Sequence, residues 1–170
     1  MTVDEFLTTY AAVDGRYELV DGVPVMMPSA NARHNRVLGN LRANLYASLD
    51  NGPCEVFGAD MALQVSEHDV RFPGAAIYCD PSDLAPGNDR QPCLHHPHVI
   101  FEIAALSSAT IDWLTRLIEY QQLPSVDTIV MIDPDRCTLT TYVRADGNAW
   151  TMTSHPVGVA LRLRDPEVEI

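Results

Sequence analysis

The chain has 170 residues, 46% of them hydrophobic, and this length suits one domain, residues 1–170, around one continuous core. Its 23 acidic and 11 basic residues give a formal net charge of −12, which disfavours DNA binding through a broad basic surface. All 11 basic residues are arginines, so no lysine of this chain can act in catalysis. No segment has the pattern of a signal peptide or the length of a membrane-spanning helix, so we expect a cytoplasmic protein without membrane contact.

The cysteines are far apart in the sequence and form no Cys-x-x-Cys pair. They are Cys54, Cys79, Cys93 and Cys137. This spacing indicates neither a zinc site built from thiolates nor a disulfide framework. We therefore expect free and mostly buried thiols.

The first half of the chain predicts a helix, a hairpin, a long helix and then strands. Residues Val3–Ala12 predict a short helix, and Asp21-Gly22 suits the tight turn of a hairpin between Tyr17–Val20 and Val23–Met27. Apolar residues at helical spacing predict a long helix that ends at Leu49. Strands are expected at Cys54–Phe57, Met61–Val65, Phe72–Cys79 and Val99–Ala105.

The second half predicts one more helix and several antiparallel strands. The helix is expected from about Thr110 to Leu123, with Leu114, Leu117 and Ile118 facing inward. Strands are expected at Thr128–Ile132, Thr138–Val143, Trp150–Thr153 and Val159–Leu163, with turns at Asp133-Pro134 and Asp146-Gly147. The segment Asp80–Pro97 predicts a long, mobile loop. Together these elements predict an α/β (α+β) fold whose central mixed sheet is flanked by helices.

Two glutamates interrupt apolar strands and are candidate functional residues. Glu102 lies inside an expected core strand, where an unpaired carboxylate is costly to bury. Strand alternation places it on the same face as His98 and Ile100, so it either projects into a site or pairs with a cation. Glu18 has a similar pattern, but a hairpin near the surface can expose a glutamate at little cost. We expect Glu18 in solvent on this reasoning alone.

Other polar residues point less clearly to a functional site. Asp112, Arg116 and Tyr120 share one helix face, where Asp112 and Arg116 can form an ion pair, but such a stripe is ordinarily solvated. The His95-His96-Pro97-His98 segment could bind a transition metal, although nothing fixes a tetrahedral ligand set. His34 is expected to be a polar residue at a helix end.

Several motifs in order carry a resemblance to a known family. They are Tyr17-Glu18-Leu19-Val20-Asp21-Gly22, Arg33-His34-Asn35-Arg36 before Gly39-Asn40-Leu41, Cys54 to Met61, Pro97 to Ile103, Asp112, Tyr120 and Leu123-Pro124-Ser125. The chain resembles the Uma-type restriction-endonuclease-like family, a branch of the PD-(D/E)XK nuclease superfamily. The resemblance implies the restriction-endonuclease-like fold, with an N-terminal helix and hairpin before the central sheet.

The resemblance also implies a metal site from which this sequence departs. The family holds metal with an Asp after a Pro and a Glu on the next strand, and a Lys follows on a helix. Glu102 matches the family glutamate, and Glu18 matches the acidic residue of the first hairpin. Gly74 stands at the Asp position and Arg116 at the Lys position.

Further departures surround this site. The family's Ser-Pro-Ser-Thr after the glutamate reads Ala105-Leu106-Ser107-Ser108. Asp60 is a candidate replacement for the missing carboxylate. Asp80 lies too far along the strand from Gly74, roughly 20 Å at the strand rise per residue.

Three functions follow as hypotheses. The first is a Mg²⁺- or Mn²⁺-dependent DNA endonuclease in which Glu102 and Glu18, with Asp60, hold the metal and Arg116 stabilises charge. The second is a non-catalytic binding or scaffold protein without a metal, in which Glu102 and Arg116 form a buried ion pair. The third is a metal-binding protein that uses the segment His95–His98. Because of Gly74 and Arg116 we expect weak or absent cleavage, and we expect a homodimer.

Overall fold

The computed structural model describes residues 1–50, 52–104, 110–146 and 149–170. Its larger sheet consists of β3 (Glu55–Gly58), β6 (Ala75–Tyr78), β8 (Pro97–Ile103), β9 (Thr128–Asp133), β10 (Thr138–Arg144) and β11 (Trp150–His155). The strand order is β11-β10-β9-β8-β6-β3. β8 and β9 are parallel, whereas the other neighbours are antiparallel. The predicted central mixed sheet is therefore confirmed.

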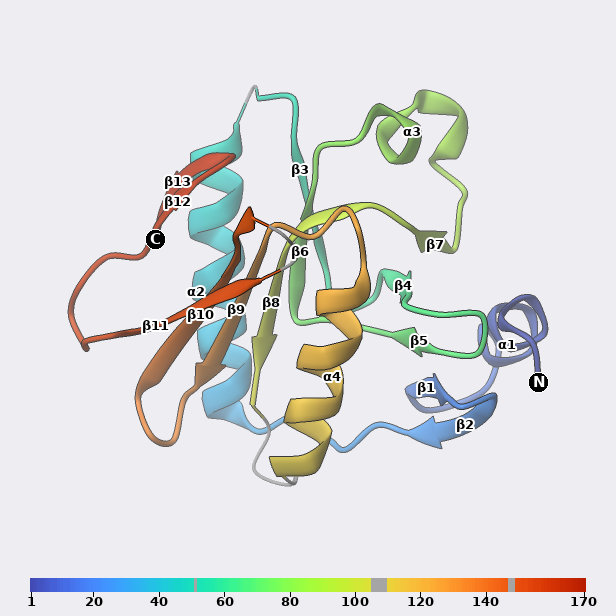
Figure 1. The fold of residues 1–170 in the computed structure, drawn as a ribbon. Helices are drawn as coiled ribbons and strands as arrows, with labels where there is room; N and C mark the ends of the chain where they lie inside the picture. Colours follow the sequence, from blue (N-terminus) through green and yellow to red (C-terminus); the bar gives the residue numbers. More distant parts are fainter. Residues whose placement is uncertain (51, 105–109, 147–148) are drawn as a thin grey trace.

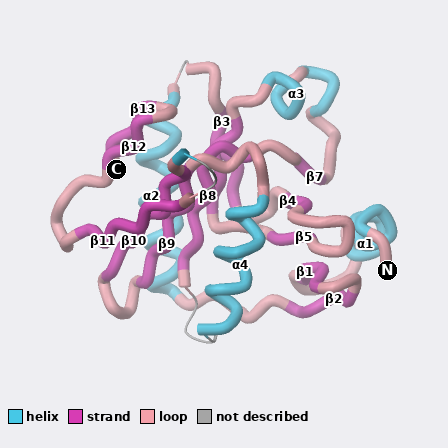
Figure 2. Tube along the Cα trace, viewed as in Figure 1, coloured by secondary structure: helices cyan, strands magenta, loops and turns pink. Residues whose placement is uncertain are grey.

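Two helices cover opposite faces of this sheet, α2 (Ala32–Leu49) and α4 (Thr110–Gln122) (Figure 1, Figure 2). Leu41 and Leu45 of α2 pack in one core with Phe101 of β8. Ile100 points to the other face and packs in a second core with Leu117 of α4. Alternation along β8 thus gives each helix its own set of apolar partners.

A second sheet carries the N-terminal hairpin. It consists of β1 (Tyr17–Val20), β2 (Val23–Met26), β4 (Ala62–Gln64), β5 (Val70–Arg71) and β7 (Cys93–Leu94), in the order β2-β1-β5-β4-β7. Asp21 and Gly22 both have positive φ, as a tight hairpin turn requires. The helix α1 (Val3–Tyr10) packs against this sheet through Phe6 and Leu19. The predicted helix and hairpin are confirmed.

The inward face of α4 differs from the prediction. Leu117 is buried as expected, but Leu114 is 51% exposed and Ile118 is 55% exposed. The helix turns Arg116 and Tyr120 toward the protein instead. The expectation for Leu114 and Ile118 was wrong because polar partners on both sheets hold this face of the helix inward.

The segment Asp80–Pro97 has more structure than the predicted loop. It contains α3 (Pro81–Leu84), the 3₁₀ turn η1 (Pro86–Asn88) and β7. The buried carboxylate of Asp83 accepts hydrogen bonds from the backbone N–H groups of His95 and His96. A buried acceptor thus ties the two ends of this segment together.

The C-terminal strands also depart from the prediction. β12 (Arg162–Arg164) pairs with β13 (Glu167–Glu169) in a separate two-stranded sheet and does not extend the central sheet. Two further expectations, the turn at Gly147 and the end of a strand at Ala105, lie outside the described residues. Of the helices described, none is both long and apolar enough to cross a membrane.

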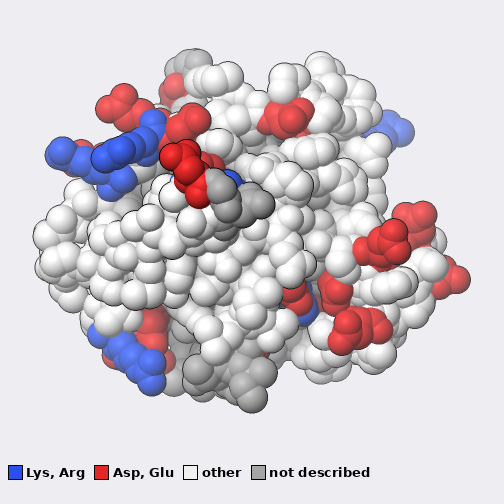
Figure 3. All heavy atoms as spheres, viewed as in Figure 1, with Lys and Arg blue, Asp and Glu red and all other residues white. Residues whose placement is uncertain are grey.

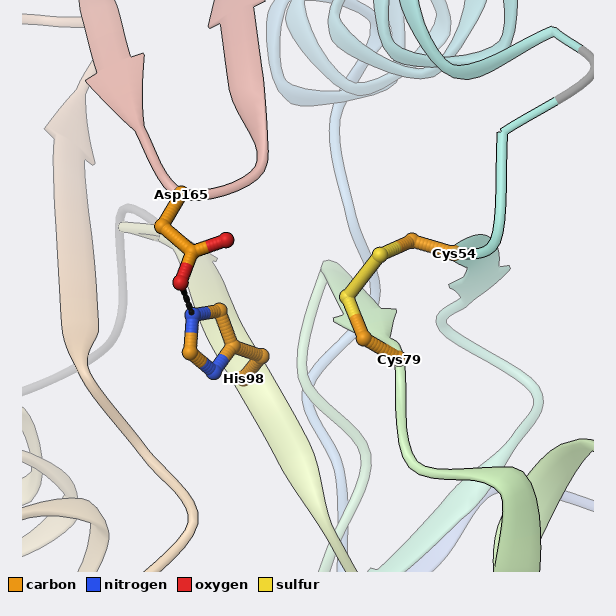
Figure 4. The surroundings of a disulfide bond; sticks show 4 residues. All are labelled: Cys54, Cys79, His98 and Asp165. Carbon is orange, nitrogen blue, oxygen red and sulfur yellow. Dashed lines mark ion pairs between the residues drawn. A yellow bond between two sulfur atoms is a disulfide. The ribbon is translucent and has the colours of Figure 1, made fainter.

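Two of the four cysteines form a disulfide, which the sequence analysis did not predict. Cys54 and Cys79 are bonded and flank the paired positions Glu55 and Tyr78 of β3 and β6. Figure 4 shows this disulfide near the ion pair between His98 and Asp165. The expectation of free thiols was wrong for this pair because the strand register, which spacing alone does not reveal, brings the two sulfurs together.

The double variant Cys54→Ala/Cys79→Ala should lose about 3 kcal/mol of unfolding free energy, because the disulfide restricts the unfolded chain. Urea denaturation monitored by circular dichroism measures this loss, and Cys137→Ser serves as the control because Cys137 is exposed and free. In the unreduced, denatured protein, only Cys93 and Cys137 should react with a thiol reagent. Reaction of all four cysteines would contradict the pairing.

Candidate functional site

A buried polar cluster lies where α4 meets both sheets. Glu18 comes from β1, Glu102 from β8 and Arg116 from α4. The guanidinium of Arg116 donates to both carboxylate oxygens of Glu18, with Nη1–Oε1 at 2.9 Å and Nη2–Oε2 at 2.6 Å. Nη1 also donates to Oε1 of Glu102 at 3.2 Å. One arginine therefore bridges carboxylates from two sheets.

Both glutamates are buried, so the expected exposure of Glu18 is wrong. The physical reason is its set of partners: besides Arg116, the backbone N–H of Phe72 donates to Oε1 of Glu18 at 3.1 Å. The expected pair between Asp112 and Arg116 does form, at 3.3 Å. Yet Arg116 is largely enclosed, with 15% of its side chain exposed, so this face of α4 is not the solvated stripe that the spacing indicated.

Tyr120 completes the contacts of Glu102. Its hydroxyl is buried and donates to Oε1 of Glu102 at 2.5 Å. The sequence placed Tyr120 on the helix face of Asp112 and Arg116, but a helical repeat gives no information about which strand residue the face meets. The contact with Glu102 was therefore missed.

A second arginine, Arg71 of β5, was not identified from the sequence. Its side chain is 2% exposed and forms a two-point contact with Glu119 of α4, at 2.8 and 2.6 Å. Its Nη1 lies 3.4 Å from Oε2 of Glu18. The available signal was a charged residue between the apolar residues Val70 and Phe72, the same signal that identified Glu102.

The cluster has more negative than positive groups. Four carboxylates, from Glu18, Glu102, Asp112 and Glu119, surround the guanidinium groups of Arg71 and Arg116, which gives a formal charge of −2 when all are ionised. The carboxylates come from three elements: the Glu18 and Glu102 side chains are buried, whereas 43% of the Asp112 side chain is exposed.

Burial and neighbouring charges shift the titration of this cluster. Desolvation raises the pKa of Glu102, although Arg116 and the Tyr120 hydroxyl act in the opposite direction. Desolvation, then the charge of Glu102, raises the pKa of Tyr120, so its hydroxyl remains a donor. Burial disfavours the charge of Arg116, but Glu102, Tyr120 and Glu18 together raise its pKa above the usual arginine value. Arg116 is thus a permanent cation in this site.

The structure does not bring Asp60 into this cluster. Asp60 lies in the turn between β3 and β4, its side chain is 96% exposed, and its carboxylate is 3.9 Å from Arg16. Among the described residues, no contact joins Asp60 to Glu18, Glu102 or Arg116.

Gly74, which stands at the family's Asp position, lies beside the cluster at the start of β6. An added Cβ would lie 3.2 Å from the carbonyl oxygen of Phe101 and 3.7 Å from side-chain atoms of Leu38 and Ile103. The backbone of β8 therefore approaches this position more closely than a side chain ordinarily allows. A groove of about 100 Å³ runs past Gly74, Glu102 and Arg116 to the surface.

Two histidines of the expected metal segment, His96 and His98, have separate acidic partners. His96 Nδ1 lies 3.3 Å from Asp83, whereas His98 Nε2 lies 3.4 Å from Asp165 (Figure 4). His34, expected at a helix end, lies in the first turn of α2, where its backbone N–H donates to the N-cap Asn31.

The residues of the cluster do not fit the divalent metal that the family resemblance implies. Mg²⁺ requires free oxygen ligands in near-octahedral geometry. Both oxygens of Glu18 and Oε1 of Glu102 already accept hydrogen bonds, and Gly74 supplies no ligand. Within the described part of the chain, no three His, Cys, Asp or Glu side chains are grouped so that they could hold a metal ion.

Removing Arg116 should destabilise the fold strongly. Arg116→Ala leaves Glu18 and Glu102 without their shared cation, and the loss expected for breaking such a buried pair is about 3–5 kcal/mol. Urea denaturation measures it. Arg136→Ala is the matched control, because Arg136 is exposed and, among the residues described, forms an ion pair with Asp133 alone, at 3.7 Å. Equal stabilities of the two variants would contradict a structural role of Arg116.

Glu102→Gln, in contrast to Arg116→Ala, should increase the free energy of unfolding, and the increase should depend on pH. Because the folded-state pKa of Glu102 is raised, its ionised form costs stability above that pKa, and the cost fades as the pH falls toward the ordinary value of 4.5. The variant should therefore unfold at a higher urea concentration than the wild type at pH 8 and match it near pH 4.5. A variant less stable than the wild type at pH 8 would contradict this assignment.

Comparisons with known proteins agree with this architecture. The chain matches the Uma2 family, described as "Putative restriction endonuclease", over residues 3–167. An uncharacterized protein of Synechocystis sp. is 23% identical over 154 residues, covering 90% of this chain and 86% of its own length. A second one is 19% identical over 165 residues, covering 96% and 85%.

A solved structure has a similar fold. The crystal structure of "a putative nuclease belonging to DUF820" from Anabaena variabilis superimposes with a TM-score of 0.77 at 14% identity, over 96% of this chain and 89% of that chain. This likeness confirms the expected fold class. Because the family match spans nearly the whole sequence, the chain belongs to the Uma2 family of restriction-endonuclease-like proteins.

Proposed function

We propose that this protein is a non-cleaving member of its nuclease family that acts as a binding or scaffold protein. The observation that carries the proposal is the guanidinium of Arg116, which bridges Glu18 and Glu102 at 2.6–3.2 Å. These are the two carboxylates to which the family resemblance assigns the metal. An internal, permanently charged side chain thus satisfies them in place of a metal ion.

Four further features support this proposal. Gly74 has no side chain that could supply a third metal ligand. The chain also has no lysine to orient an attacking water. The planar guanidinium of Arg116 is a poor proton acceptor because its pKa is raised. The face of the molecule in Figure 3 has no broad basic area over α4, in keeping with the net charge of −12.

The competing function is a weak Mg²⁺- or Mn²⁺-dependent endonuclease that acts on DNA. Isothermal titration of the metal-stripped protein with each ion, with plasmid nicking on the same samples, separates the two. We expect no saturable binding and no nicking, in the wild type as in Glu102→Ala. Metal binding by the wild type that Glu102→Ala abolishes, together with nicking, would overturn the proposal.

Restoring the family residues should restore metal binding. The double variant Gly74→Asp/Arg116→Lys supplies the missing carboxylate and frees Glu18 and Glu102 from the bidentate guanidinium, so we expect Mn²⁺-dependent nicking. Gly74→Asn/Arg116→Lys is the matched control, with the same size but no added charge. Circular dichroism must first confirm folding, because Phe101 lies close to the added Cβ. Equal activity of the two variants would contradict this reading of the site.

We also propose a homodimer that forms through β11, the edge strand of the larger sheet. Trp150–His155 contains no Asp, Glu or Arg, and Met152 is 62% exposed. Uncharged edge strands are open to pairing with another chain unless they are short or contain proline. The edge strand β2 of the other sheet is shorter and contains Pro24.

Met152→Lys should weaken this dimer, because two lysines would meet at the symmetric edge. Met26→Lys on β2 is the matched control, since Met26 is 63% exposed. Sedimentation equilibrium should give a dimer for the wild type and for Met26→Lys, and a monomer for Met152→Lys. A monomeric wild type would contradict dimerisation, and a dimeric Met152→Lys would contradict the use of β11.

A further inference from the structure

A larger cavity lies beside the Arg116 cluster, among α1, the hairpin β1–β2 and the turn between β3 and β4. Its volume is about 410 Å³, within the range of small-molecule sites. Four aromatic side chains line it, from Phe6, Tyr10, Tyr17 and Phe72. We name it the aromatic cavity. Neither the polar cluster nor the family resemblance assigns it a role.

The aromatic walls are held by the fold itself. Phe6 and Tyr10 stack on one side of α1 with ring centroids 5.2 Å apart, and Tyr17 of β1 meets Tyr10 edge-on at 4.9 Å. Gly15 has a φ of 105°, and a Cβ there would lie 3.2 Å from the Tyr17 ring. The backbone therefore closes tightly over the Tyr17 ring.

Two opposite charges lie at the rim of the aromatic cavity. Arg16 and Asp60 both line it, with Arg16 Nη2 at 3.9 Å from Asp60 Oδ1. Arg16 also donates to the carbonyl oxygen of Ala59, which fixes its guanidinium at this position. Half of the Arg16 side chain and nearly all of the Asp60 carboxylate remain exposed. A ligand that lies against the aromatic rings thus meets one acceptor and one cationic donor.

We propose that the aromatic cavity binds a guanine nucleotide. A flat base stacks on aromatic rings whatever its sequence context. The Asp60 carboxylate matches the adjacent ring N–H and exocyclic amino donors of guanine, and Arg16, 3.9 Å away, matches the neighbouring O6 acceptor on the same edge of the base. The nucleotide is either free or part of a single strand. This inference goes beyond the proposed function because it names a ligand class and a site outside the Arg116 cluster.

The aromatic cavity is continuous with the groove at Arg116. Arg16, Met27, Ala59 and Phe72 line both. A single strand whose base occupies the cavity could therefore extend its backbone toward that groove. One base and few phosphates suffice for binding, so a net charge of −12 does not exclude such a ligand as it disfavours a long duplex.

The test compares guanosine and inosine 5′-monophosphate, which differ only by the exocyclic amino group, by isothermal titration. In the wild type, the guanosine nucleotide should bind about fivefold more tightly, the value of one hydrogen bond. In Asp60→Asn the two nucleotides should bind with closely similar affinity. The exposed variant Glu67→Gln is the control and should keep the preference. Tyr10→Leu should weaken both nucleotides about tenfold through lost stacking.

Titration with a short single-stranded DNA that contains one guanine shows whether the natural ligand is a free nucleotide or a single strand. The same strand with inosine in place of guanine is the control. Tighter binding of the strand than of the mononucleotide assigns the cavity to single-stranded nucleic acid, and weaker binding assigns it to a free nucleotide. The proposal is overturned if guanosine 5′-monophosphate gives no saturable heat at millimolar concentration. It is also overturned if Asp60→Asn, which is exposed and should fold normally, keeps the full preference for the amino group.

Discussion

The ion pairs of the buried Arg116 guanidinium join the two sheets, and the arrangement of the polar cluster depends on them. From α4 the guanidinium reaches Glu18 of the smaller sheet and Glu102 of the larger one. Arg71 connects α4 to the smaller sheet in the opposite direction: its side chain extends from β5 of that sheet to Glu119 of α4. Since a buried carboxylate without a partner is costly, each arginine fixes the relative position of the elements that it joins. The same contacts occupy the oxygens that a nuclease site would offer to metal.

The elements with local signals could be predicted from the sequence. The hairpin follows from Asp21-Gly22, whose backbone adopts the required positive φ, and α2 follows from its apolar spacing and from Asn31, which caps its first turn. Glu102 could be identified because a carboxylate in an apolar strand needs a partner. The resemblance to the family named Glu18 and Arg116 as candidate site residues.

Long-range contacts could not be predicted in the same way. The burial of Glu18 depends on Arg71 and Arg116, which are 53 and 98 residues away in the chain. The Cys54–Cys79 disulfide depends on the register of β3 and β6. The apolar residues Leu114 and Ile118 indicated the wrong face of α4, because the face that meets the two sheets carries Arg116, Leu117 and Tyr120 instead.

The close approach of β8 to Gly74 also affects how substitutions at Gly74 and Arg116 would combine. A lone acidic replacement at Gly74 would add a further negative charge beside a cluster that already has a formal charge of −2, and it would press on the Phe101 carbonyl. A lone replacement of Arg116 would remove the cation that holds Glu18. Either replacement alone is therefore expected to cost folding stability, and their effects on the unfolding free energy should not be additive.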